Sequence, residues 1–261
     1  MEIVVLPSAD EVARVAASTI AALVRADPET VLGLATGSSP TGVYAELRRL
    51  AEAGEVSFSR VHGFALDEYV GLPLAHPESY ASVLARDVVE PLGLDPRRVH
   101  VPDGRADDLD AAADRYERRI LDAGGIDLQI LGIGANGHIG FNEPTSSLAS
   151  RTRLKTLAPR TRDDNARFFD APELVPTQCL TQGIGTILDA GQLLLVAQGV
   201  SKADAIAAAV EGPLSSFVPA SALQLHPHAT VILDEAAASG LQLLDYYRST
   251  TADPPTRQRD R

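Results

Sequence analysis

The chain has 261 residues, of which 45% are hydrophobic, which is enough apolar material for one large α/β domain. Its 35 acidic and 23 basic residues give a net charge of -12, which repels nucleic acid and anionic membranes, so we expect neither as a partner. One cysteine, Cys179, excludes an intrachain disulfide and a cysteine-ligated metal cluster. The N-terminal residues lack the pattern of a signal peptide, and no apolar stretch is long enough to span a bilayer, so we expect a cytoplasmic protein.

Short apolar runs alternate with helical patterns along the chain. Strands are expected at residues 2–7, 31–35, 61–67, 99–102, 126–134, 192–199 and 229–235. Helices are expected at residues 11–26, from about 40 to 53, and at 79–89, 108–124 and 201–212. This alternation predicts a doubly wound, mostly parallel, Rossmann-like sheet flanked by helices in a single domain, residues 1–247. The polar segment 248–261 is expected to be a disordered tail.

The segment ATGSSPTGVY begins at Ala35, at the end of an expected strand, and leads into a helix. Ser39 is the expected N-cap, and Pro40 is the expected first helical residue. Free backbone N–H groups and the positive end of the helix dipole predict an anion site in the loop at 36–39. An ordinary capped turn is the alternative.

Two acids, Asp67 and Glu68, follow the apolar strand that ends at Leu66. One carboxylate can cap a helix or loop, while the other can serve as a general base. A metal site is less favoured, because no further acid or histidine nearby completes a set of ligands. A purely structural role for both acids stays open.

The segment LGIGANGHIGFNEP places His138 and Glu143 in a glycine-rich turn directly after an expected buried strand. Glycines let the backbone approach a ligand closely. A histidine with a nearby carboxylate suits acid–base chemistry. We therefore interpret this turn as catalytic, with a structural histidine as the alternative.

Only two of the 23 basic residues are lysines, Lys155 and Lys202. Lys202 lies at the expected start of a helix, where a cation opposes the helix dipole unless an anion joins it. Arg151, Arg153 and Lys155 alternate, so an extended backbone would put them on one face. They indicate a second anion site, or a strip that neutralises nearby acids.

These motifs together resemble the glucosamine-6-phosphate deaminase family. The resemblance extends from residue 1 to about 247 and includes FALDEYVGLPLAHPESY, GIGANGHIGFNEP, SSLASRTRLKTL, NARFF and SALQLHPHATVILDE. It implies a Rossmann-like fold and chemistry without a metal or an organic cofactor. It assigns the substrate phosphate to Thr36, Gly37, Ser38, Ser39, Arg167 and Lys202.

The resemblance also implies catalytic roles. Asp67 is the expected base that moves a proton between C2 and C1 of the open sugar, and it must be ionised in the free enzyme. His138 is the expected acid/base for ring opening, assisted by Glu143. Many family members have Asp two residues before this histidine, whereas this chain has Asn136, which we expect to hold the imidazole by a hydrogen bond.

In parts of the family, N-acetylglucosamine 6-phosphate activates the enzyme at a subunit interface of a hexamer. The matching positions are Met1, Ser146, Arg153 and Lys155, so the resemblance implies a homo-oligomer and allosteric activation.

Two functions other than deamination remain as alternatives. One is a hydrolase similar to 6-phosphogluconolactonase, which usually carries DER and lacks FNEP. The other is a sugar-phosphate sensor, which would not need Asp67.

Overall fold

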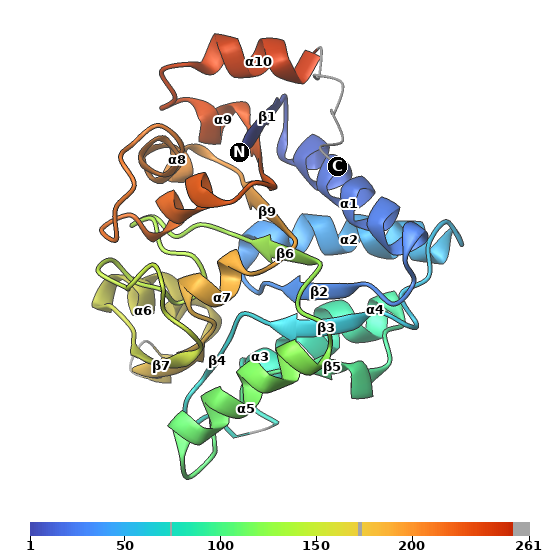
Figure 1. Ribbon diagram of the computed structural model, residues 1–261, viewed down its shortest axis with the longest axis vertical. Coiled ribbons are helices and arrows are strands. Elements are labelled where there is room, and N and C mark those ends of the chain that lie inside the picture. The colour runs from blue at the N-terminus through green and yellow to red at the C-terminus, as the bar shows by residue number, and fades with distance from the viewer. Residues whose placement is uncertain (74, 172–173, 253–261) are drawn as a thin grey trace.

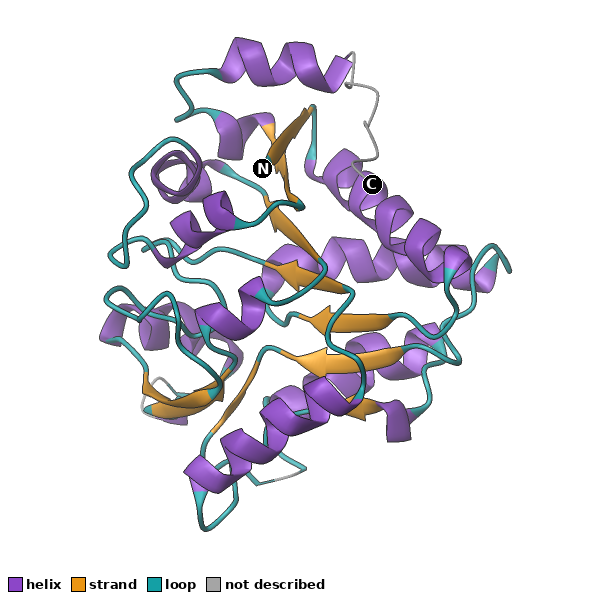
Figure 2. Cartoon of the chain, viewed as in Figure 1, coloured by secondary structure: helices purple, strands orange, loops and turns teal. Residues whose placement is uncertain are grey.

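The computed structural model describes residues 1–73, 75–171 and 174–252, and it is drawn in Figures 1 and 2. A seven-stranded sheet runs through the molecule in the order β1-β10-β9-β6-β2-β3-β5, and every pairing in it is parallel. Its strands are β1 (Glu2–Leu6), β2 (Val31–Leu34), β3 (His62–Ala65), β5 (Val99–His100), β6 (Leu128–Leu131), β9 (Gln192–Ala197) and β10 (Ala229–Asp234). The seven strands fall within the seven ranges predicted from the sequence, so the mostly parallel single-domain fold is confirmed.

The order of the strands reverses between β2 and β6. After β2 the chain adds β3 and then β5 on one side, and after β6 it adds β9 and β10 on the other. The loops that follow β2 and β6 therefore diverge at the carboxyl ends of adjacent strands. In open α/β sheets a ligand crevice forms at such a switch point.

A second, antiparallel sheet was not predicted from the sequence. It contains β4 (Asp67–Tyr69), β8 (Gln178–Thr181) and β7 (Arg153–Thr156), in the order β4-β8-β7. The strand expected at 61–67 was therefore wrong at its end, because β3 stops at Ala65 and Asp67 begins β4. These strands have three or four residues, too few to show a clear alternation of apolar and polar positions.

Helices surround the large sheet (Figure 2). They are α1 (Ala9–Ala26), α2 (Ser38–Glu52), α3 (Tyr80–Leu84), α4 (Glu90–Leu92), α5 (Leu109–Asp122), α6 (Pro159–Asn165), α7 (Ile184–Leu188), α8 (Ala203–Val210), α9 (Glu235–Ala238) and α10 (Leu244–Ala252). Single turns of 3-10 helix precede β5, follow α6 and precede α8, and a longer 3-10 segment covers Pro219–Leu225. None of the described helices is long and apolar enough to cross a membrane.

Two predicted helix boundaries were wrong. Helix α2 begins at Ser38 with Gly37 as its N-cap, so Ser39 is not the cap and Pro40 is the third helical residue. Proline is tolerated there because the first N–H groups of a helix have no intrahelical partner. The single helix expected at 79–89 is a short α3, a π turn over Ala85–Val89 and α4.

The predicted boundary of the C-terminal tail lies inside a helix. Helix α10 runs to Ala252, and its residues Leu244 and Tyr247 pack against the main core. The sequence interpretation considered only residues from 248 onward, which lack such apolar anchors. The rest of the predicted tail, 253–261, lies outside the described residues.

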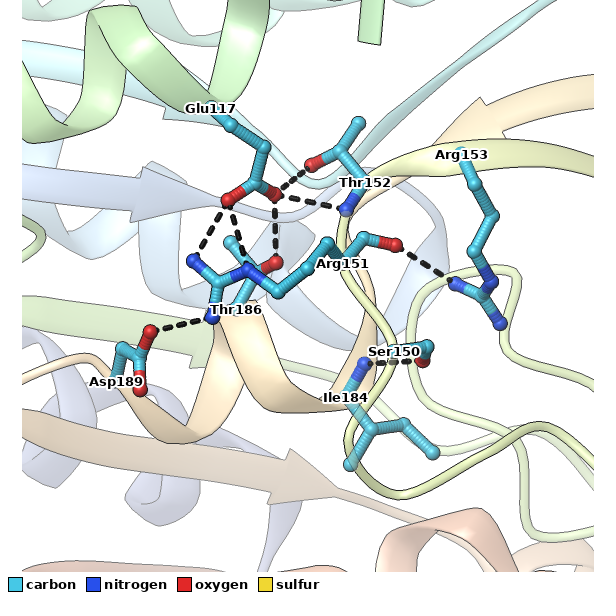
Figure 3. A network of polar contacts seen from close by, with 8 residues as sticks. All are labelled: Glu117, Ser150, Arg151, Thr152, Arg153, Ile184, Thr186 and Asp189. Carbon is cyan, nitrogen blue, oxygen red and sulfur yellow. Dashed lines mark hydrogen bonds and ion pairs between the residues drawn. The ribbon is translucent and has the colours of Figure 1, made fainter. Parts of the chain in front are cut away.

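A carboxylate on α5 ties the second sheet to the helices (Figure 3). Glu117 accepts hydrogen bonds from the backbone N–H and hydroxyl of Thr152, from the hydroxyl of Thr186, and from the guanidinium of Arg151. Arg151 also pairs with Asp189. Burial opposes ionisation, but these hydrogen bonds hold the pKa of Glu117 below its ordinary value. The cluster fixes the chain immediately before β7.

We expect Glu117→Gln to lower the free energy of unfolding at pH 7 by about 2 kcal/mol, because several charge-assisted hydrogen bonds weaken. A folded-state pKa that is depressed gives stability that is present above 4.5, the ordinary value, and is lost as the pH falls through the folded pKa. The difference between variant and wild type should therefore shrink in acid. Urea unfolding at pH 7 and below pH 4 measures both.

The matched control is Glu52→Gln, which breaks an exposed pair with Arg48 on α2. Exposed pairs contribute about 0–1 kcal/mol, so this variant should remain close to wild type. Equal losses in the two variants would contradict the role given to the Glu117 cluster.

Candidate active site

A cleft of about 140 Å³ opens at the carboxyl ends of β2, β3 and β6, where the strand order reverses. It gathers all six residues predicted to bind phosphate, together with Asp67 and His138. Its described lining is Ala35, Thr36, Gly37, Ser38, Ser39, Leu66, Asp67, Tyr80, Gly132, Ile133, Gly134, His138, Gly140, Phe141, Thr161, Asp164, Asn165, Arg167 and Lys202. Side chains separated by up to 167 positions in the sequence (Ala35 and Lys202) therefore share one site.

The residues predicted to bind phosphate lie around the start of α2. Gly37 has φ of +90°, a conformation that side chains other than glycine rarely adopt, and it turns the chain from β2 into the helix. No side chain among the described residues caps this helix, so the N–H groups of its first turn remain available. Arg167 extends to the same place, with Nη2 3.4 Å from Oγ of Ser38.

Lys202 also lines the cleft. It precedes α8, as the sequence predicted, and its Nζ donates a 2.8 Å hydrogen bond to the carbonyl of Ile133. Burial lowers its pKa, and the positive charges of Arg167 and Arg160 lower it further, while Asp164 opposes them. An arriving dianion would relieve this crowding of positive charge.

The two acids after β3 have different environments. Glu68 accepts hydrogen bonds from the backbone N–H groups of Tyr69, Tyr80 and Ala81 at 2.8–2.9 Å. Two of these donors begin α3, so Glu68 caps that helix, as one of the alternatives for this pair predicted.

Asp67 is the acid that lines the cleft, and only 5% of it is exposed. Burial, and then the charge of Glu68, raise its pKa to about 8, although hydrogen bonds with Phe141 and Thr181 oppose the shift. This upward shift opposes the expectation that Asp67 is ionised in the free protein, because exclusion of water disfavours the charged carboxylate.

The imidazole of His138 occupies space that a side chain at position 134 would fill, and Gly134 leaves it open. A Cβ at Gly134 would stand 2.2 Å from Cε1 of the imidazole. Burial lowers the pKa of His138, and Glu143 partly opposes this, with its Oε2 3.7 Å from Nδ1. The ring is therefore neutral near pH 7, with a carboxylate beside it.

Asn136 does not hold the imidazole, and that expectation was wrong. Its Oδ1 accepts from the backbone N–H of His138 at 3.2 Å, and its Nδ2 donates to Oε2 of Glu143 at 2.8 Å. Asn136 and Glu143 lie behind the lining of the cleft. The tight turn places the amide beside the histidine backbone, so Asn136 orients the carboxylate and not the ring.

The sequence interpretation missed three lining residues on α6: Thr161, Asp164 and Asn165. Their spacing of three and four positions puts them on one face of a helix. Pro159 at the first helical position was the available signal for this element. Tyr80 on α3, whose hydroxyl lies 3.4 Å from that of Tyr69, was also missed.

The structure brings only part of the predicted second anion site together. Arg153 and Lys155 share one face of β7, and Arg153 donates a 2.7 Å hydrogen bond to Oδ1 of Asn142. Arg151 neutralises two acids, which was the alternative considered for this strip.

Two other residues predicted to contribute to that site lie differently. Ser146 is buried, and its hydroxyl has no hydrogen-bond partner among the described residues. Met1 precedes β1 at the edge of the other sheet, and Figure 1 draws it well away from β7. A site that combined Met1 with Lys155 would therefore need two copies of the chain.

The known proteins that are similar to this chain belong to the family that its motifs resemble. A model of the glucosamine-6-phosphate isomerases/6-phosphogluconolactonase family matches residues 7–232. Glucosamine-6-phosphate deaminase from Cutibacterium acnes is 56% identical over 250 residues, covering 96% of each chain. The deaminase from Mycolicibacterium smegmatis is 55% identical over 259 residues, covering 99% of each. The chain belongs to the glucosamine-6-phosphate deaminase family.

Solved structures distinguish this family from its neighbours in the same fold. A monomeric glucosamine-6-phosphate deaminase superposes with a TM-score of 0.90 at 42% identity, covering 92% of this chain and 100% of its own. The 6-phosphogluconolactonase from Thermotoga maritima gives 0.69 at 20% identity, covering 89% and 98%. That second likeness shows a shared fold alone.

We expect Asn136→Asp to raise the pKa of His138 in this deaminase-family chain. The new carboxylate would stand beside Glu143 and the histidine backbone, and negative charge favours the imidazolium. NMR titration of the imidazole measures the shift. An unchanged midpoint would show that position 136 does not tune the histidine.

Proposed function

We propose that this protein converts glucosamine 6-phosphate and water to fructose 6-phosphate and ammonia. The observation that carries the proposal is the composition of the cleft, which combines a helix N-terminus and two basic side chains with the buried carboxyl of Asp67 and a histidine whose pKa is lowered. Each part matches one step of an aldose–ketose isomerisation followed by loss of ammonia.

The first turn of α2, Arg167 and Lys202 are proposed to bind the phosphate. Backbone N–H groups at a helix N-terminus and two basic side chains provide the charge that an acidic protein otherwise lacks. An anchored phosphate fixes the sugar relative to Asp67 and His138, and such positioning supplies a large part of a rate enhancement.

His138 is proposed to open the pyranose ring. A neutral imidazole can take the proton from the hydroxyl at C1 and deliver one to the ring oxygen. Glu143 would stabilise the imidazolium that forms in between, and Asn136 keeps this carboxylate in place.

Asp67 is proposed to move the proton from C2 to C1. Removal of the C2 proton gives an enolamine, and protonation at C1 gives an imine at C2, which water attacks to release ammonia. The substrate itself carries an ammonium group on C2. A cation beside a buried carboxyl favours its ionised form, so substrate binding would lower the raised pKa of Asp67 and create the base.

The first test is ammonia release from glucosamine 6-phosphate by wild type and Asp67→Asn. The variant should lose at least about a hundredfold in kcat, the low end of what a positioned acid–base group contributes. Wild type that releases no ammonia but hydrolyses 6-phosphogluconolactone would overturn the proposal in favour of the hydrolase. Binding of sugar phosphate without turnover would favour the sensor.

We further propose activation by N-acetylglucosamine 6-phosphate in a homo-oligomer, as large as a hexamer, in the cytoplasm. Arg153 supports this, because it contacts Asn142, the residue before Glu143. An anion drawn to Arg153 and Lys155 would compete for that contact and shift the catalytic turn. Substrate-saturation curves should move to lower substrate concentration when the activator is added, and Lys155→Ala should abolish the effect. Curves that ignore the activator would refute the regulation.

A further inference from the structure

One acidic side chain lies at the cationic end of the cleft. Asp164 on α6 lines the cleft together with Lys202 and Arg167. Asp164 and its neighbour Asp163 are both exposed, but Asp163 is not among the described residues of the lining. A carboxylate at a place that must receive a phosphate dianion opposes binding, so it needs an explanation.

The carboxyl of Asp164 and the ammonium of Lys202 line the same cleft. Among the charges that act on the pKa of Lys202, that of Asp164 has the largest effect. It raises this pKa, whereas Arg167 and Arg160 lower it. Within the described part of the chain, Asp164 forms no ion pair at the distance of direct contact. The carboxylate thus shares the cleft with Lys202 and Arg167, and no ion pair among the described residues holds it there.

The position of Asp164 also distinguishes it from the acids of the catalytic end. Of the charges that act on the pKa of His138, that of Asp164 has the smallest effect and that of Glu143 the largest. Asp67, the buried acid of the cleft, is the group placed to face C2. Asp164 lies three residues before Arg167 and lines the cleft with it, so we assign it to the phosphate end and not to the amino group of the substrate.

We propose that Asp164 is a counter-charge that competes with the substrate phosphate for Lys202 and Arg167 and so weakens the hold of the cleft on phosphate esters. In the free protein the carboxylate of Asp164 offsets part of the positive charge of Lys202 and Arg167. The incoming phosphate then replaces it as the partner of these two cations. The phosphate is present in substrate and product alike, so tighter binding of it would lower KM without speeding the chemistry. A weaker hold lets the product leave.

The inference takes the identity of the substrate from the proposed function, but its phosphate-binding part does not depend on turnover. Two variants of the full chain separate the possibilities: Asp164→Asn, and the matched control Asp163→Asn on the same helix. Calorimetric titration with inorganic phosphate gives a dissociation constant without turnover, and ammonia release gives KM and kcat for glucosamine 6-phosphate.

Asp164→Asn should lower the dissociation constant for inorganic phosphate about threefold to tenfold at low ionic strength, with a smaller effect in salt. The KM for glucosamine 6-phosphate should fall in parallel, with kcat unchanged or reduced. Asp163→Asn should match wild type in both measurements. Circular dichroism verifies that both variants fold.

Unchanged or weaker phosphate binding in Asp164→Asn would overturn the inference. A raised KM with unchanged phosphate binding would also overturn it and would assign Asp164 to the amino group. Wild type that binds phosphate and releases no ammonia would refute the proposed function, while the effect of Asp164 on phosphate binding would still decide the inference.

Discussion

The candidate site depends on a short joint between the two sheets. Leu66 lies between β3 and β4, and its N–H donates to the carbonyl of Leu34 in the large sheet. Its own carbonyl accepts from the N–H of Gln182, directly after β8, and the buried side chain of Gln182 donates to the carbonyl of Ala65. Because both sheets hold the backbone of Leu66, the next residue, Asp67, has little conformational freedom and faces the cleft.

Burial also determines the electrostatics of the cleft. Loss of hydration raises the pKa of the Asp67 carboxyl and lowers those of His138 and Lys202. All three shifts favour the neutral form. A substrate that brings both an ammonium and a phosphate supplies the missing partners, so ligand binding and the charging of the site are coupled.

The sequence predicted the large sheet well because each parallel strand is a nearly continuous apolar run, such as β6, whose four residues are all buried. It also predicted the residues at the strand ends, since glycines, hydroxyls and paired acids stand out against such runs. The second sheet escaped prediction because its strands are short and owe their pairing to distant partners. Asn136 shows the same limit, as the partner of its amide depends on the fold of a turn and not on spacing.

The chemistry proposed for the cleft depends most directly on the protonation of Asp67. A 13C NMR titration of aspartate-labelled protein, with Asp67→Asn to identify the resonance, would measure this carboxyl alone. The structure predicts a midpoint of about 8 in the free protein, and a lower midpoint when a sugar phosphate with an ammonium group is bound. A midpoint near 3.8, the ordinary value for aspartate, would contradict the claim that burial sets the chemistry of the cleft.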